Sequence, residues 1–231
     1  MDLFVDSFIS AVLLIKALDA EVCGIVLVSL KVSSSSTLIA SLIGIPAGFV
    51  IAFKEFRGKR MTITILNTLL ALPTVVIGLF VYAFISRRAV FGPLDLLYTQ
   101  KAIVIGQVIL IIPIVTTFTI AAISRIDDRY RKSAMTLGAS TLQTAGVIFR
   151  EARFGVFAAV IASFGRVISE VGISMMLGGN AKGFTRTMTT AMALEYDKGE
   201  FILAVALGLI LLSISFALNI FFNYLQGRVK A

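Results

Sequence analysis

Two opposite charges stand four residues apart inside an otherwise apolar stretch of this chain. Arg166 and Glu170 belong to the segment 156–177, which is long and apolar enough to cross a bilayer as a helix. Residues four apart share a helical face, so these side chains can pair about ten residues into the span, near the bilayer midplane. A lone charge there costs about 2.5–3.5 kcal/mol, so the pair should face protein or water. A structural ion pair and a direct role toward a substrate both fit this pattern.

Histidine is missing from all 231 residues of the sequence. This excludes histidine zinc sites, Ser–His and Cys–His nucleophilic pairs, and histidine acid–base catalysis. The sequence also lacks G-x-S-x-G, H-E-x-x-H and Walker A patterns. The single cysteine, Cys23, rules out an intramolecular disulfide. We therefore expect this chain not to be an enzyme, because a membrane-embedded enzyme would have few residues from which to build a catalytic site.

The elements that must hold the paired charges are continuous apolar runs. Hydrophobic residues make up 58% of the sequence, more than in soluble domains, and the runs do not alternate as barrel strands do. This composition predicts an all-α polytopic membrane protein with one membrane domain. Five spans are expected, at residues 22–53, 62–85, 102–123, 156–177 and 201–224, with a polar glycine-rich loop at 178–199. Residues 1–20 predict an N-terminal amphipathic or interfacial helix.

The net charge of +8 follows from basic residues at the span ends, so nucleic acid is not an expected partner. One side of the predicted topology carries Lys54, Arg57, Lys59, Arg60, Arg125, Arg129, Arg131, Lys132, Arg150, Arg153, Arg228 and Lys230. The other side carries Arg87, Arg88, Lys101, Lys182, Arg186 and Lys198. The richer side should be cytoplasmic, which places the N-terminus outside and the C-terminus in the cytoplasm.

A charged segment rich in small residues, 127–153, separates the third and fourth expected spans. Two aspartates at its start can cap a short helix, and Gly138 can adopt the left-handed conformation that ends it. Ser140 followed by Gln143 is a capping box, which predicts a second helix from about Thr141. The segment should therefore form a helix–glycine–helix elbow on the cytoplasmic side, suited to contact with a partner outside the membrane.

Five spans with this elbow resemble the permease of a bacterial ABC importer, whose elbow carries an E-A-A-x-x-x-G loop. The matched positions here are Lys132, Ser133, Ala134, Gly138 and Ala139. The family's leading glutamate is replaced by lysine, and a later Leu-Pro pair is replaced by Arg150-Glu151, while the helix–glycine–helix pattern is kept. The resemblance implies the ABC transmembrane type-1 (MetI-like) fold over residues 21–225.

Two further stretches favour a particular cargo. "ALPTVVIGLFVY" (71–82) resembles the "LPPVVVG" segment of molybdate and tungstate permeases. The segment 163–195 is similar to the tungstate branch, in which S-E-V-G, M-M, G-G-N and T-R-T recur. The resemblance thus implies an oxyanion importer and favours tungstate, with molybdate or sulfate as alternatives. A stand-alone secondary carrier is the other alternative, although neither inverted repeats nor a coupling-ion site is evident.

The resemblance also implies an assembly in the bacterial inner membrane. It comprises a second copy of this chain, two ATP-binding cassette subunits and an extracytoplasmic oxyanion-binding protein, working by alternating access. The chain itself needs no cofactor, since ATP and Mg²⁺ would bind to the partner ATPase.

The resemblance also implies roles for particular residues in this assembly. Coupling to the ATPase is expected from Ala134, Met135, Leu137, Gly138, Ala139 and Glu151. The pathway or gate is expected to include Pro73, Arg166, Glu170, Asn180 and Arg186. Plainer interpretations remain open: Pro73 and Pro113 can be ordinary kinks, Gly138 a simple helix end, and Asn180 part of a loop turn.

Overall fold

A computed structural model describes the backbone of residues 2–227 and the side chains of residues 8–221 and Tyr224. Within this range the chain is all-α, as expected. Its elements are α1 (Asp2–Lys16), α2 (Ala20–Phe53), α3 (Lys59–Leu69), α4 (Thr74–Ile85), η1 (Gly92–Leu94), α5 (Gln100–Ser124), α6 (Asp128–Thr136), α7 (Thr141–Ile168), α8 (Gly172–Gly178), α9 (Met188–Lys198) and α10 (Phe201–Gly227). Arg228 and Lys230, which contributed to the predicted orientation, lie outside the described residues.

The expected spans are present, but two of them are broken. In the described chain, α2, α5 and α10 are long and apolar enough to cross a membrane. Two bent pairs, α3 with α4 and α7 with α8, raise the number of candidate spans to five, and their helices meet at 96° and 59°. The predicted spans 62–85 and 156–177 thus each overlap a bent pair of helices and not one straight helix.

The first break follows from proline chemistry. Pro73 has extended backbone angles and lies directly before α4, while α3 ends at Leu69. A proline disfavours the helical conformation in the residue before it, so α3 stops short of Pro73. Pro113 does not break its helix, because it lies inside the continuous helix α5.

Two further boundaries differ from the prediction. The second helix of the elbow and the fourth span form one helix, α7, which runs unbroken through residues 154–155. Part of the predicted loop 178–199 is also helical, because Thr187 and Thr190 form a capping box that starts α9.

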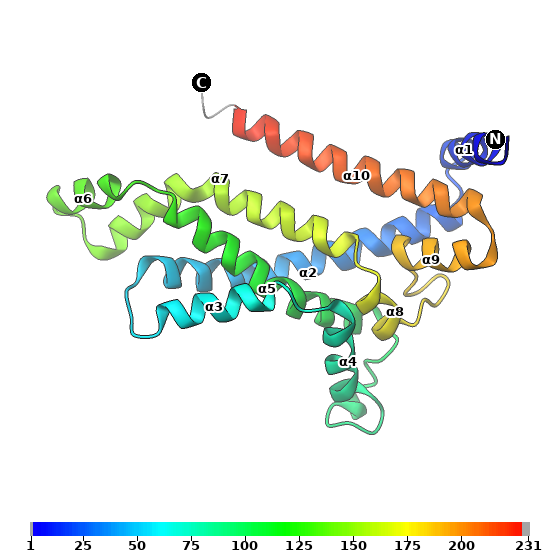
Figure 1. Cartoon of the computed structure of the whole chain (residues 1–231), viewed down its shortest axis with the longest axis horizontal. Coiled ribbons are helices and arrows are strands. Elements are labelled where there is room, and N and C mark those ends of the chain that lie inside the picture. The colour runs from blue at the N-terminus through cyan, green and yellow to red at the C-terminus, as the bar shows by residue number, and fades with distance from the viewer. Residues whose placement is uncertain (1, 228–231) are drawn as a thin grey trace.

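Figure 1 shows α2, α5, α7 and α10 running along the long axis of the molecule, with α6 at one end and α1 and α9 at the other. The closest packing joins α2 to α5. A Cβ atom on Gly44 would lie 2.9 Å from Val115 Cβ, and one on Gly48 would lie 2.6 Å from the Thr116 carbonyl oxygen. Small residues therefore let these two helices approach closely, as in other membrane bundles.

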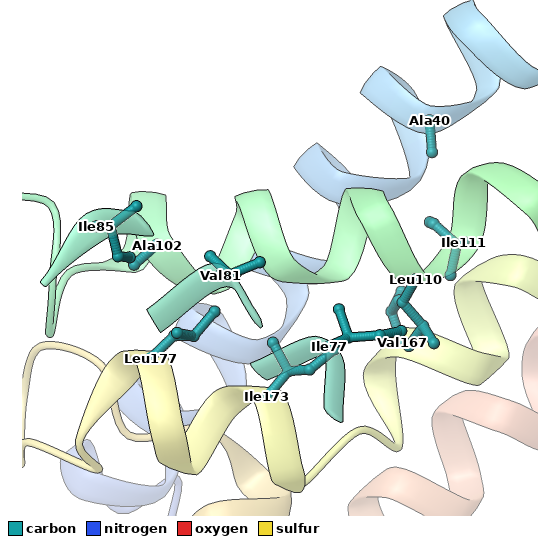
Figure 2. Packing of buried hydrophobic residues seen from close by; sticks show 10 residues of the cluster. All are labelled: Ala40, Ile77, Val81, Ile85, Ala102, Leu110, Ile111, Val167, Ile173 and Leu177. Carbon is teal, nitrogen blue, oxygen red and sulfur yellow. The ribbon is translucent and has the colours of Figure 1, made fainter. Parts of the chain in front are cut away.

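The main core joins both broken spans to the bundle. It contains Ala40, Ile77, Val81, Ile85, Ala102, Leu110, Ile111, Val167, Ile173 and Leu177. Figure 2 shows these side chains gathered from α2, α4, α5, α7 and α8. The two short helices α4 and α8 thus pack directly on each other and on α5.

The N-terminal helix is short. At 15 residues α1 falls below the length of a span, and it packs against α10 with Ala11 fully buried. Asp19 then starts α2, because its Oδ1 accepts hydrogen bonds from the N–H groups of Glu21 and Val22. The interfacial position of residues 1–20 stays a prediction.

The bundle places the elbow and the α8–α9 loop at opposite ends, which makes the predicted orientation testable. In a Cys23→Ser background, cysteines at Val90 and Ala181 should react with an impermeant thiol reagent added outside intact cells. A cysteine at Ser133 should react only after the membrane is opened. All three native side chains are exposed, so access depends on the side of the membrane. The reverse pattern would overturn the orientation.

Candidate functional site

The two helix breaks face each other where α4 and α8 begin. A Cβ atom on Gly172, the first residue of α8, would lie 3.0 Å from Thr74 Oγ1 and 3.3 Å from Val75 Cγ2 at the start of α4. Pro73, one of the predicted gate residues, precedes this contact directly. Broken helices occur at membrane depth only where protein or a polar cavity surrounds them. The facing breaks are therefore the first candidate for a functional centre.

Arg166 and Glu170 form the predicted ion pair at this centre. Arg166 Nη1 lies 2.7 Å from Glu170 Oε2, with the arginine side chain 42% exposed and the glutamate 3% exposed. The pair is not inside a helix as the sequence suggested. Because α7 ends at Ile168, Arg166 lies in its last turn and Glu170 lies beyond its end. A cation at a helix C-terminus is favoured by the helix dipole.

The glutamate also organises the next helix. Glu170 Oε1 accepts a hydrogen bond from the Ile173 N–H at 3.3 Å, so the carboxylate caps the first turn of α8. Its backbone carbonyl accepts from the Thr189 hydroxyl at 2.8 Å, which ties the break to α9. One residue therefore neutralises Arg166, starts α8 and anchors α9.

A buried polar seam completes this centre. Gln107 Nε2 in α5 donates to the Val167 carbonyl at 3.4 Å, and Gln107 Oε1 accepts from the Ser36 hydroxyl in α2 at 2.8 Å. Ser29, two helical turns earlier in α2, accepts from the Met188 N–H at 2.7 Å. Sequence reasoning missed Gln107, although a lone amide in an apolar span was a signal that could have found it.

A second ionic cluster lies at the end of the bundle near α1 and α9. Arg186 Nη1 is 3.6 Å from Glu21 Oε1 and 3.7 Å from Glu195 Oε1. Glu21 also pairs with Lys182, and Glu195 with Lys198. The predicted gate residue Arg186 is thus separate from the Arg166–Glu170 pair and is held by two carboxylates.

Asn180 lies in the same loop, in a turn conformation. Its φ of 50° is in the left-handed region, which asparagine tolerates, and its Nδ2 donates to the Thr190 carbonyl at 3.3 Å. This contact fits the loop-turn interpretation. Among the described atoms its buried Oδ1 has no hydrogen-bond partner.

The elbow has the geometry that its sequence predicted. Asp127 caps α6, Gly138 has a φ of +80°, and Ser140 with Gln143 makes the capping box of α7. The Ala139 N–H donates to the Ala134 carbonyl across the glycine turn at 3.0 Å. These contacts stop one helix and start the next within a few residues.

The tip of the elbow exposes apolar side chains. Leu137 and Leu142 are 87% and 84% exposed, and Met135 is also exposed, whereas Ala134 is buried beneath them. A pocket of about 620 Å³ opens beside this tip, lined by Asp127, Arg129, Tyr130, Ser133, Ala134, Leu137 and Val147. Glu151 is exposed on α7, and no ion-pair partner is found for it in the described chain. An apolar patch on a polar tip is typical of an interaction surface.

The elbow touches the bundle through aromatic contacts. The Arg131 guanidinium lies 5.1 Å from the centre of the Phe53 ring, and Phe149 packs edge-on against Phe49 with ring centres 5.8 Å apart. These contacts join α6 and α7 to the end of α2. The candidate residues therefore form three groups: the elbow, the helix breaks, and the loop between α8 and α9 that holds Asn180 and Arg186. The helix α7 connects the first two groups.

The family described as "Binding-protein-dependent transport system inner membrane component" matches residues 44–231. The tungstate uptake system permease protein TupB of Peptoclostridium acidaminophilum is 38% identical over 98% of this chain and 99% of that protein. The protein of the same name from Campylobacter jejuni is 38% identical over 95% and 92%. The molybdenum transport system permease protein ModB of Escherichia coli K12 is 27% identical over 82% and 90%.

A solved structure has the same fold. The crystal structure of a bacterial alginate ABC transporter, in complex with its alginate-bound periplasmic protein, contains a chain that superposes with a TM-score of 0.74. The two chains are 16% identical, and the alignment covers 91% of this chain and 80% of the other. With the family match, this similarity confirms the ABC transmembrane type-1 fold expected from the sequence.

The geometry of the helix break predicts that removing one charge of the Arg166–Glu170 pair destabilises the protein more than removing both. Arg166→Met should destabilise the protein more than the double change Arg166→Met with Glu170→Gln, because the single change leaves a buried carboxylate unpaired. Since Arg166 is partly exposed, the single change should lower the free energy of unfolding by about 1–3 kcal/mol, which is less than expected for a fully buried pair. Thermal unfolding of the purified protein in detergent measures the difference.

Lys132→Met provides the matched control, because Lys132 pairs with Asp128 at the same spacing on an exposed helix. An exposed pair contributes about 0–1 kcal/mol, so this variant should melt close to the wild type. If Arg166→Met also melts like the wild type, the pair does not stabilise the break.

Proposed function

The chain belongs to the family of inner membrane components of binding-protein-dependent transport systems, and from this premise we propose that it is the permease subunit of a tungstate importer. The observation that carries the proposal is the 38% identity to a tungstate uptake permease, which extends over 98% of this chain. The similarity to a molybdenum permease is weaker, at 27% over 82% of the chain. As a multi-pass permease the chain is not an enzyme, and ATP is handled by a partner ATPase.

The proposed complex contains two copies of this permease, two ATPase subunits and one extracytoplasmic binding protein. The elbow faces the cytoplasm, together with the C-terminus, and docks on the ATPase. Its exposed Leu137 and Leu142 support this role, because apolar side chains on a polar tip lose unfavourable water contact when a partner covers them. The ionic cluster around Arg186 then faces the extracytoplasmic side.

The pathway runs between the two permease copies. Figure 1 shows α4 projecting away from the long bundle, and its Val75, Val76, Leu79 and Phe80 side chains are exposed. We assign this face to the second copy, since the helix breaks at the base of α4 would then line the interface. A divalent oxyanion cannot cross hydrocarbon unaided, because its desolvation cost is prohibitive.

Transport follows from movement of the elbow. ATP binding draws the two ATPase subunits together and shifts both elbows, and α7 carries this displacement to the Arg166–Glu170 break. The breaks in the two copies then open the pathway toward the binding protein, and hydrolysis resets it. In this mechanism Arg166, Glu170 and Pro73 act at the gate, while Ala134, Gly138 and their neighbours act in coupling.

The function is tested by reconstitution in liposomes. The permease, its ATPase and the binding protein should together accumulate tungstate when ATP is supplied to the ATPase side. Omitting the ATPase or the binding protein should abolish uptake. Transport by the permease alone would support a secondary carrier, and uptake of molybdate or sulfate in place of tungstate would move the assignment to those anions.

The elbow gives a separate prediction. Replacing Leu137 and Leu142 with serine should weaken ATPase docking, because truncating a central, well-packed interface side chain can cost about 2 kcal/mol or more. The fold should be unchanged, since both side chains are largely exposed. Co-purification of the ATPase and ATP-driven uptake measure the loss.

The control is Leu18→Ser, a leucine that is 75% exposed and lies between α1 and α2, at the opposite end of the bundle from α6. It should leave docking and uptake intact. Wild-type docking by the Leu137→Ser, Leu142→Ser variant would show that the ATPase binds elsewhere.

A further inference from the structure

The basic residues of the predicted extracytoplasmic side divide into two groups. Lys182, Arg186 and Lys198 are paired with Glu21 and Glu195, as described above. Arg87, Arg88 and Lys101 have no carboxylate within ion-pair distance in the described part of the chain. The positive-inside rule disfavours basic residues on this side, so unneutralised arginines here call for a specific explanation.

The two arginines line one pocket, and Lys101 lines a different one. The arginine pocket has a volume of about 480 Å³ and is lined by Tyr82, Ser86, Arg87, Arg88, Asp95, Leu97 and Tyr98. Guanidinium groups, phenol hydroxyls and a serine hydroxyl are all hydrogen-bond donors. The pocket therefore combines several donors with two positive charges and a single carboxylate.

The wall of this pocket is held in a strained conformation. Tyr98 has a φ of 62°, which is unusual for a bulky residue, and Asp95 has a φ of 48°. The Tyr98 N–H donates to the Leu177 carbonyl at 2.8 Å, and a Cβ atom on Gly179 would lie 2.7 Å from the Tyr98 ring. Backbone strain kept in place by specific contacts is concentrated at functional sites.

The turn that carries the two arginines is also constrained. A Cβ atom on Gly92 would overlap the Arg87 carbonyl, so only glycine allows the chain to fold back over the arginine turn. The Phe91 N–H donates to the Phe84 carbonyl at 3.0 Å and closes the same turn. Arg87 and Arg88 are thus exposed side chains on a fixed backbone.

We propose that this arginine pocket is an entry site that binds the tetrahedral oxyanion before it reaches the helix breaks. The inference rests on the proposed function and adds a substrate contact to it. A guanidinium group donates two parallel N–H bonds to an oxyanion, and two adjacent arginines match a dianion in charge. Tyr98 connects the pocket to α8, through its bond to Leu177, and so to the break beyond.

Asp95 gives the site its second property. Its carboxylate repels the same anion, and this weakens binding without removing the arginine contacts. A transport pathway must bind its ion strongly enough for entry but weakly enough for release. Removing the arginines should therefore weaken anion binding, whereas removing the charge of Asp95 should strengthen it.

The test measures tungstate binding to the full-length permease in lipid nanodiscs, without ATPase or binding protein. The permease is equilibrated by dialysis against sodium tungstate at fixed ionic strength, and the bound tungsten is then quantified by mass spectrometry. The variant Arg87→Gln, Arg88→Gln should bind about tenfold more weakly or worse, because charge-assisted bonds are lost. Asp95→Asn should bind several-fold more tightly, because one like charge is removed.

Lys101→Gln is the matched control, since it removes one unpaired extracytoplasmic charge outside the pocket. It should bind tungstate like the wild type. Unsaturable binding by the wild type, wild-type affinity in the arginine variant, or an equal loss in Lys101→Gln would each overturn the entry site.

Reconstituted uptake separates this result from the proposed function. Wild-type uptake of tungstate with no binding in dialysis would refute the entry site alone, whereas absence of uptake would refute the tungstate importer. If the arginine variant binds tungstate normally but needs more binding protein for uptake, the arginines dock that protein and the entry site is wrong.

Discussion

The structure depends on one constraint: a helix interrupted inside an apolar span must satisfy its freed backbone groups within the protein. At the α7–α8 break these groups are bonded by side chains from α5 and α9 and by the carboxylate of Glu170 itself. The Val167 carbonyl accepts a hydrogen bond from Gln107 in α5, and the Glu170 carbonyl accepts one from Thr189 in α9. The Glu170 carboxylate accepts one from the Ile173 N–H in the first turn of α8. The break is therefore the point at which four helices are fixed to each other.

The continuity of α7 gives this arrangement its mechanical meaning. The helix has 28 residues, so it spans about 42 Å at the α-helical rise, from the capping box at Ser140 to the last turn with Arg166. The elbow meets the bundle near one end of this rod, and the break lies at the other. In the proposed importer, a displacement of the elbow is therefore transmitted along a single helix to the ion pair.

Local signals in the sequence predicted the elbow well, because capping residues act within three or four positions along the chain. The Arg166–Glu170 contact was predictable for the same reason. The effect of proline was not, since Pro73 lies at a 96° bend while Pro113 lies inside an unbroken helix. Gln107 and Ser36 are 71 positions apart, so only the packing of α2 on α5 brings them together. Pro73 and the lone amide of Gln107 are visible in the sequence, but tertiary packing decides which proline lies at a bend and which partner the amide finds.

The distribution of charge explains how such a chain could pass an anion without binding it permanently. Both basic residues of the predicted gate are neutralised: Arg166 by Glu170 at the helix break, and Arg186 by Glu21 and Glu195 at the end of the bundle. In the proposed importer, Arg166 would attract an oxyanion more strongly once the Glu170 carboxylate moved away from it. That withdrawal would also release the Ile173 N–H and loosen the first turn of α8. In the proposed importer, a single movement of Glu170 would consequently expose the charge of Arg166 to the anion and free the start of α8 to move.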